Sequence, residues 1–195
     1  MRSRRAAFLD RDGVINVDHG YVVRREDFAF VPGVFDAARR LHAGRWALVV
    51  VTNQSGIGRG LYTEQDFRTS ADWMRQRFAD EGAPLAGVYF CPHHPTDALG
   101  SYRRDCDCRK PGPGMFLQAA RELGIDLEGS AMFGDRHSDL AAARAAGVPH
   151  RFLLGTDGAT LPSVPVVPEL ETGRFRSLLD AVASAPFATL TEADR

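Results

Sequence analysis

The stretch AAFLDRDG, residues 6–13, is a short apolar run that ends in two aspartates one residue apart. Apolar runs of this length between polar segments are typical of buried strands. Strand candidates occur at residues 6–9, 46–51, 87–90, 130–133 and 151–154. Stretches with helical spacing lie between them, at residues 33–43, 64–80, 113–123 and 138–146. This alternation predicts an α/β fold, a Rossmann-like three-layer sandwich whose mostly parallel central sheet is covered by helices on both faces.

The predicted helices carry start and stop signals. Thr63 and Asp66 have the spacing of a capping box in front of the second predicted helix. Pro113 suits the first turn of the third predicted helix. Gly82 and Gly124 stand where the second and third helices are expected to end, because glycine commonly follows the last helical residue.

Length and composition predict one soluble globular domain over residues 1–195. Residues 155–195 are expected to form a late edge segment and a tail, with a helix near 174–184. A net charge of −1 gives no basic field for nucleic acid, and 44% hydrophobic residues are typical of globular proteins. The apolar run that follows the basic start covers only residues 6–9, too short for a signal peptide or a membrane span. We therefore expect a cytoplasmic monomer without nucleic-acid or membrane partners.

Polar residues follow the predicted strands at the point where each strand ends. Asp10 and Asp12 follow the first strand, Thr52 and Asn53 follow the second, and Asp135 follows the fourth. The carboxyl ends of parallel strands meet at one edge of the sheet, where open α/β sheets bind their ligands. Carboxylates gathered there would repel one another, so we expect a divalent cation among them. Hard oxygen ligands of this kind suit Mg²⁺.

Lys110 is the single lysine of a chain that has 24 lysines and arginines in total. It stands just before a predicted helix, on a connection that leads to the same sheet edge. An ammonium is a compact point charge, whereas a guanidinium is a wide planar fork. A lysine retained here therefore predicts a site that needs a small cation. Asp139 lies one helical turn after Asp135, and we expect it to cap or support a helix.

The three cysteines and a histidine form two closely spaced pairs, Cys91 with His93 and Cys106 with Cys108. Three thiolates and one imidazole could close a tetrahedral zinc site, and four protein ligands would make that zinc structural rather than catalytic. His94 is an alternative imidazole, and buried cysteines without a metal are a further alternative. A disulfide is disfavoured, because Cys106 and Cys108 are too close in sequence for relaxed geometry.

Four segments resemble, in order, the four motifs of the haloacid dehalogenase superfamily of phosphohydrolases: DRDGVI, VVVTNQSG, RKP and GDRHSD. The longer segments FLDRDGVINVDHGYV, VVVTNQSGIGRG, CPHHP and CDCRKPGPGM are similar to the heptose bisphosphate phosphatases of that superfamily. Histidinol-phosphate phosphatases are related alternatives, although the length of the loop at residues 94–105 is typical of the heptose enzymes. The resemblance implies a phosphatase of a small phosphorylated sugar. It also implies a small flap after the first strand and a zinc-pinned loop at residues 91–108.

The same resemblance implies roles for the residues at the sheet edge. Asp10 would attack phosphorus and form an aspartyl-phosphate, and Asp12 would act as the general acid and then as the general base. Thr52 and Lys110 would stabilise the transferring phosphoryl group. The implied Mg²⁺ ligands are the carboxylates of Asp10 and Asp135 and the backbone carbonyl of Asp12. The implied structural Zn²⁺ ligands are Cys91, His93, Cys106 and Cys108.

Substrate contacts follow from the resemblance as well. Arg109 would recognise the second phosphate or the sugar, a bidentate task that suits arginine. Arg136 stands where the family commonly has lysine, so the charge is kept while the geometry changes. A zinc-stabilised binding module without chemistry is the rival interpretation, and it would predict losses among the catalytic residues, all of which are present. The implied substrate contacts are Asp18, His19, Gly20, Tyr21, Asn53, Gln54, Ser55, Arg109 and Arg136.

Overall fold

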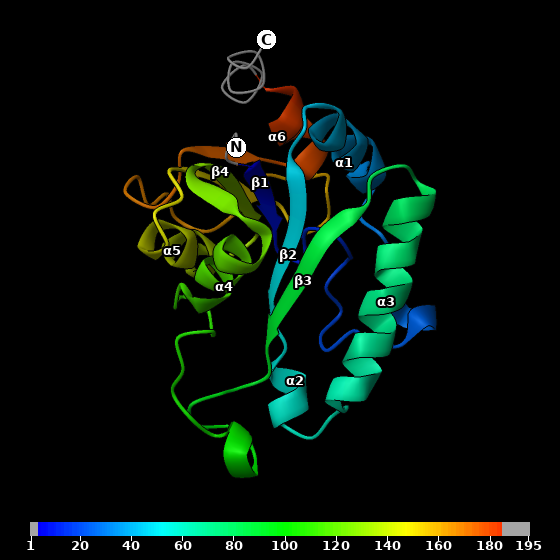
Figure 1. Cartoon of the computed structure of the whole chain (residues 1–195), viewed down its shortest axis with the longest axis vertical. Coiled ribbons are helices and arrows are strands. Elements are labelled where there is room, and N and C mark those ends of the chain that lie inside the picture. Colours follow the sequence, from blue (N-terminus) through cyan, green and yellow to red (C-terminus); the bar gives the residue numbers. More distant parts are fainter. Residues whose placement is uncertain (1–3, 185–195) are drawn as a thin grey trace.

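A parallel sheet forms the centre of the computed structural model, which describes residues 4–184 (Figure 1). The strand order is β3-β2-β1-β4-β5-β6, and each neighbouring pair is parallel. All the carboxyl ends of the strands therefore point to the same edge. The strands are β1 (Arg4–Leu9), β2 (Ala47–Asn53), β3 (Leu85–Cys91), β4 (Ile125–Gly134), β5 (His150–Leu154) and β6 (Gly173–Phe175).

Helices cover both faces of the sheet, so the predicted three-layer α/β/α architecture is confirmed. Helices α1, α3 and α6 pack on one face, and α4 and α5 pack on the other. No helix within residues 4–184 is long and apolar enough to cross a bilayer. The helices are α1 (Val34–Ala43), α2 (Ser55–Gly58), α3 (Glu64–Asp80), α4 (Gly114–Leu123), α5 (His137–Ala145) and α6 (Leu178–Ala183), with short 3-10 turns at Arg25–Asp27 and Gly100–Tyr102.

Strand β1 shows how the sequence builds the two cores. Ala7 and Leu9 are buried against the α1 and α3 face, while Ala6 and Phe8 are buried against the α4 and α5 face. This division follows from the alternation of side chains along a strand. Because both faces are covered, every residue of the run is apolar. The ring of Phe8 lies 4.8 Å from the ring of Phe116 on α4.

The predicted helix boundaries are close to those observed. Thr63 Oγ1 accepts a hydrogen bond from the backbone N–H of Asp66 at 3.1 Å, and Asp66 Oδ2 accepts one from the backbone N–H of Thr63 at 2.8 Å. The capping box is therefore present. Gly124 ends α4 with φ of 64°, and Gly82 follows α3 with φ of 73°. Both adopt the left-handed conformation that glycine reaches without a steric penalty.

The C-terminal segment differs from the expectation. The helix expected near 174–184 is shorter, and β6 precedes it as a three-residue strand parallel to β5. A strand of only three residues, GRF, is too short to show an alternating pattern, so the sequence carried no signal for it. The short helix α2 was also not predicted. The end of the expected tail, residues 185–195, lies outside the described residues.

Candidate active site

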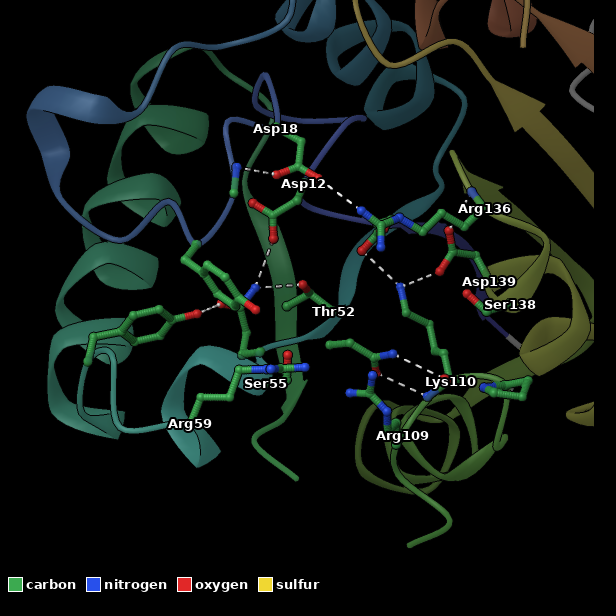
Figure 2. Close-up of a pocket in the computed structure, with 17 residues that line it drawn as sticks. Asp12, Asp18, Thr52, Ser55, Arg59, Arg109, Lys110, Arg136, Ser138 and Asp139 are labelled. Atoms are coloured by element: carbon green, nitrogen blue, oxygen red, sulfur yellow. Dashed lines mark hydrogen bonds and ion pairs between the residues drawn. The ribbon is translucent and has the colours of Figure 1, made fainter. Parts of the chain in front are cut away.

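Three strand ends and one turn meet at the carboxyl edge of the sheet and enclose a pocket of about 590 Å³ (Figure 2). Strand β1 leads to Asp10 and Asp12, β2 contains Thr52, and the turn before α4 carries Lys110. Parallel topology thus brings together residues that are far apart in the sequence. The predicted residues that line this pocket are Asp10, Asp12, Asp18, Gly20, Tyr21, Thr52, Asn53, Gln54, Ser55, Arg109, Lys110 and Arg136.

Lys110 is buried at the floor of this pocket, and its ammonium meets three acceptors. Nζ lies 2.8 Å from Asp10 Oδ1, 2.7 Å from Asp139 Oδ1 and 2.9 Å from the carbonyl oxygen of Val51. These contacts use the three N–H donors of an ammonium. Burial lowers the pKa of Lys110, but the two carboxylates outweigh it and the net shift is upward, so the group stays charged. A planar guanidinium cannot place three acceptors around one nitrogen.

Three buried carboxylates lie around this ammonium, and oxygen atoms of Asp10, Asp135 and Asp139 fall within 4.8 Å of one another. Burial, followed by the charge of Asp139, raises the pKa of Asp10 to about 7. Burial, followed by the charge of Asp10, raises the pKa of Asp135 to about 9. Asp135 Oδ1 is buried and has no hydrogen-bond partner within residues 4–184. Crowded anions with an unpartnered oxygen fit a divalent cation, which would reverse these pKa shifts.

Gly13 allows the loop after β1 to pass directly over Asp135. Its φ is +88°, a conformation that disfavours other residues. A Cβ atom at this position would lie 2.4 Å from Asp135 Oδ2, which leaves no room for a side chain. The DRDG sequence therefore needs glycine at position 13, because the carboxylate of Asp135, just after β4, occupies the space of a side chain.

The turn that carries Lys110 is tightly packed, and it is hydrogen-bonded to Asn53 of β2. A Cβ atom on Gly112 or Gly114 would lie 2.5 Å or 2.6 Å from the carbonyl oxygen of Asp107. Asn53 Nδ2 donates to the carbonyl oxygen of Lys110 at 3.1 Å, and Asn53 Oδ1 accepts from the backbone N–H of Lys110 at 3.0 Å. The amide of Asn53 thus positions Lys110. The sequence suggests only a substrate contact for Asn53.

The segment between β1 and α1 forms a small flap beside the pocket. Asp18 Oδ2 accepts a hydrogen bond from Arg136 Nη2 at 3.0 Å, which ties the flap to the start of α5. Asp18 Oδ1 accepts from the backbone N–H of Gly20 at 2.9 Å. Tyr21 is half exposed at the rim of the pocket. His19 is exposed and is not among the lining residues, so the structure does not bring it into the pocket.

The end of β3 and the loop that leads to α4 gather three thiols and one imidazole. The distances among the four ligand atoms run from 3.1 to 3.6 Å. A tetrahedral zinc ion with S and N ligands would separate them by about 3.5–3.8 Å, so the cluster fits zinc. His94 Nδ1 instead accepts from the backbone N–H of Asp97 at 3.0 Å, and His93 is the imidazole in the cluster. The ligand atoms are Sγ of Cys91, Cys106 and Cys108 and Nδ1 of His93.

This loop also holds two arginines at the rim of the pocket. Arg109 Nη1 donates to the carbonyl oxygen of His93 at 3.1 Å. Arg59 Nη2 forms an ion pair with Asp97 Oδ2 at 2.8 Å. Figure 2 shows Arg59, Arg109 and Lys110 along one side of the pocket. The thiol cluster therefore anchors a loop that supports cations at the active edge.

Some pocket residues were not predicted. Arg59 and Tyr62 line the pocket and follow TNQSG within a few residues. Extending the predicted site further along the loop after the second strand could have included them. Ser138 also lines it, without a sequence signal. Asp139 does cap α5, because its Oδ2 accepts from the backbone N–H of Arg136 at 3.0 Å. Its ion pair with Lys110 was not anticipated.

Relatives of known name identify the family of the chain. A family model described as HAD-hydrolase-like, where HAD stands for haloacid dehalogenase, matches residues 107–164. The D-glycero-β-D-manno-heptose-1,7-bisphosphate 7-phosphatase of Vibrio cholerae is 52% identical over 151 residues, which cover 77% of this chain and 81% of that protein. The protein of the same name from Escherichia coli K12 is 48% identical over 183 residues, which cover 94% of this chain and 92% of the relative. The chain belongs to this phosphatase family.

Membership of this phosphatase family makes the chain a hydrolase of phosphate monoesters with the haloacid dehalogenase fold. A solved structure from the family gives the same fold. The D,D-heptose 1,7-bisphosphate phosphatase of B. bronchiseptica, complexed with magnesium and phosphate, superposes with a TM-score of 0.76 at 33% identity. The match covers 91% of this chain and 95% of that one.

Proposed function

We propose that this phosphatase removes the C7 phosphate of D-glycero-β-D-manno-heptose 1,7-bisphosphate and releases the heptose 1-phosphate. The arrangement that carries the proposal is a buried carboxylate, Asp10, paired with the ammonium of Lys110, in a pocket that Asp12 and Thr52 also line (Figure 2). A phosphoryl group needs an aligned nucleophile and cationic surroundings. The names of the Vibrio and Escherichia relatives supply the sugar.

In the first step, an oxygen of Asp10 bonds to phosphorus while the bond between phosphorus and the sugar oxygen breaks. That oxygen keeps the bonding electrons and takes a proton from Asp12, so the sugar leaves as an alcohol. Lys110 already contacts Asp10, and its charge stabilises the equatorial oxygens of the phosphoryl group. Thr52 contributes a hydroxyl from the end of β2.

In the second step, water attacks the phosphorus of the aspartyl-phosphate. Asp12, now a carboxylate, takes a proton from the water. The bond between phosphorus and Asp10 breaks, so inorganic phosphate leaves and both aspartates return to their starting states. The two aspartates can divide these roles because they are close to one another but have different partners: Asp10 contacts Lys110, and Asp12 contacts Arg11 and Gln54.

Two metal ions fit the residues present. Mg²⁺ would be bound by the carboxylates of Asp10 and Asp135 and the backbone carbonyl of Asp12, where it would neutralise charge on the reacting phosphate. The unpartnered Oδ1 of Asp135 supports this assignment. Zn²⁺ would be bound by the thiol cluster at the end of β3 and in the loop that follows, where four protein ligands would make its role structural.

The remaining contacts concern the rest of the substrate. Arg109 lines the pocket and donates to the carbonyl oxygen of His93, and it would bind the second phosphate or the sugar. The flap residues Asp18, Gly20 and Tyr21 would contact the sugar from the other side. Because one chain supplies all these residues, a monomer would suffice. Cysteines that form no disulfide suit a reducing compartment and support a cytoplasmic location.

Phosphate release from a panel of substrates tests the proposal. The panel contains both anomers of the heptose 1,7-bisphosphate, histidinol phosphate, fructose 1,6-bisphosphate and an aryl phosphate, each with Mg²⁺. The β anomer is expected to give the highest kcat/KM. A higher value for histidinol phosphate would show that the substrate assignment is wrong. Release of the C1 phosphate instead of the C7 phosphate would contradict the regiochemistry.

A further inference from the structure

The carboxylate of Asp12 is held asymmetrically. Oδ1 accepts three hydrogen bonds, from Arg11 Nε at 3.1 Å, from Arg11 Nη2 at 2.7 Å and from Asn16 Nδ2 at 3.1 Å. Oδ2 accepts one, from Gln54 Nε2 at 3.0 Å. A carboxylate oxygen offers two lone-pair directions, so Oδ1 is saturated and Oδ2 retains one. A proton on Asp12 therefore has one favourable place, which is Oδ2.

Arg11 is rigidly enclosed, although it carries a charge. Its side chain is 1% exposed, and its guanidinium carbon lies 5.9 Å from the ring centre of Phe28 and 5.4 Å from that of Phe67. Besides Asp12, its Nη2 donates to the carbonyl oxygen of Val22 in the flap. A buried charge is tolerated only when it is paired, and Asp12 provides the opposite charge. Arg11 thus connects Asp12 to the flap through a side chain that has little room to move.

Gln54 is fixed in turn by Tyr62. The hydroxyl of Tyr62 donates to Gln54 Oε1 at 2.7 Å, so the amide presents Nε2 to Asp12 Oδ2 and, at 2.9 Å, to Thr52 Oγ1. Burial raises the pKa of Tyr62 to about 12, so the hydroxyl keeps its proton at neutral pH. A Cβ atom on Gly56 would lie 2.3 Å from the ring of Tyr62, which shows how closely the ring is packed. One hydroxyl therefore sets the orientation of the amide that faces Asp12.

We propose that Arg11 and Tyr62 are positioning residues for proton transfer, and that Asp12 exchanges its proton with the substrate through Oδ2. The proposal rests on the proposed function, in which Asp12 is the acid and then the base. As the bond between phosphorus and the sugar oxygen breaks, the proton on Oδ2 moves to that oxygen, which keeps the electron pair. The carboxylate left behind remains paired with Arg11 through Oδ1. The lone pair of Oδ2 that accepts from Gln54 is not used in the transfer.

A comparison of leaving groups separates positioning from general structural support. A sugar alkoxide is a poor leaving group and needs the proton, whereas the phenolate of 2,4-dinitrophenyl phosphate leaves without it. The measured quantity is kcat/KM, which covers the steps up to transfer of the phosphoryl group to Asp10. General acid catalysis contributes about 10²- to 10⁴-fold. With the heptose bisphosphate, Arg11→Lys is therefore expected to lower kcat/KM about 100-fold and Tyr62→Phe about tenfold. With the dinitrophenyl ester both variants stay within about threefold of wild type.

Tyr89→Phe is the matched control, because the hydroxyl of Tyr89 donates to Glu122 at 2.9 Å, away from the pocket. Tyr89→Phe should leave kcat/KM unchanged with both substrates. Tyr62→Phe keeps the ring and loses only one hydroxyl, so it provides the test even if Arg11→Lys folds poorly. Equal losses on both substrates, or no loss on the heptose bisphosphate, would overturn the proposal.

Asp12→Asn separates failure of this inference from failure of the proposed function. If Asp12→Asn loses activity only with the sugar phosphate while Arg11→Lys and Tyr62→Phe lose it equally with both substrates, Asp12 is the acid and the positioning proposal is wrong. If Asp12→Asn affects both substrates equally, Asp12 is not the acid, and the proposed function and the inference fail together.

Discussion

Two clusters of candidate metal ligands lie at the two ends of the segment 106–110, and they differ in whether they leave a ligand atom without a partner. The thiol cluster, which contains Cys91, His93, Cys106 and Cys108, gathers four ligand atoms, enough to complete a tetrahedral zinc site without a further ligand. The carboxylate cluster, which contains Asp10, Asp135 and Asp139, includes the ammonium of Lys110 and still has an unpartnered oxygen. It also opens on a pocket. The closed cluster fits a structural role, and the open cluster fits chemistry.

Asp10→Asn changes only the carboxylate cluster and is expected to have the largest effect on turnover. The amide has nearly the same size but is not a nucleophile, so kcat is expected to fall by about 10⁴-fold or more. The fold should persist, because the change removes one of three crowded carboxylates and Lys110 keeps its ion pair with Asp139. Phosphate release and metal analysis of the same sample provide the measurement. Turnover close to wild type would contradict the assignment of Asp10 as nucleophile.

Cys106→Ser breaks the other cluster and should act mainly on stability. Loss of one thiolate is expected to lower zinc from one equivalent to well below one. We expect Tm to fall by about 5–10 °C, which corresponds to roughly 2–3 kcal/mol for a chain of this length. KM should rise as well, because the same loop holds Arg109.

Asp105→Asn is the matched control for the thiol cluster, since Asp105 is an exposed neighbour in the same loop. Asp105→Asn should retain one equivalent of zinc and the wild-type Tm. If Cys106→Ser keeps a full equivalent of zinc, or loses zinc with no change in Tm, the thiol cluster does not have the structural role described.

The carboxylate cluster should make the response to Mg²⁺ depend on pH. Burial and then Asp139 raise the pKa of Asp10 to about 7, and burial and then Asp10 raise that of Asp135 to about 9, both from 3.8. The metal-free folded state therefore binds more protons than the unfolded state. Its stability is expected to fall as pH rises from about 4 through these pKa values. Mg²⁺ competes with the same protons, so the increase in Tm on adding Mg²⁺ should be larger at about pH 9 than at about pH 6.

Thermal unfolding at several pH values, with and without Mg²⁺, measures this effect. Asp135→Asn should abolish most of the Mg²⁺-dependent shift. Asp72→Asn, a change at an exposed carboxylate on α3, should leave it intact. A shift that is independent of pH in the wild type would mean that protons and Mg²⁺ do not share the cluster.

The contrast between the clusters also shows what the sequence could predict. The apolar runs predicted the parallel sheet. The polar residues that follow them predicted the edge where Asp10, Thr52, Lys110 and Asp135 gather, because the carboxyl ends of parallel strands all lie at one edge. The C-x-H and C-x-C spacing predicted the thiol cluster. The spacing does not distinguish His93 from His94, and the family resemblance favours His93, which is the imidazole in the cluster.

Side-chain partners could not be predicted in the same way. The pair of Lys110 with Asp139 and the brace from Asn53 depend on how separate loops approach one another. Arg11 is a polar residue next to two aspartates, and nothing in the sequence indicates that it folds back into an aromatic site. His19 belongs to the segment that resembles the family flap, yet it lies outside the pocket.

The most direct test of the central claim is the turnover of Lys110→Arg, measured together with its zinc content. Three acceptors surround the single nitrogen of Lys110, and a guanidinium cannot reproduce that arrangement. We predict that kcat falls by about 100-fold or more while one equivalent of zinc is retained, because the thiol cluster ends at Cys108. Wild-type turnover in this variant would contradict the account, because the open cluster would then not require an ammonium.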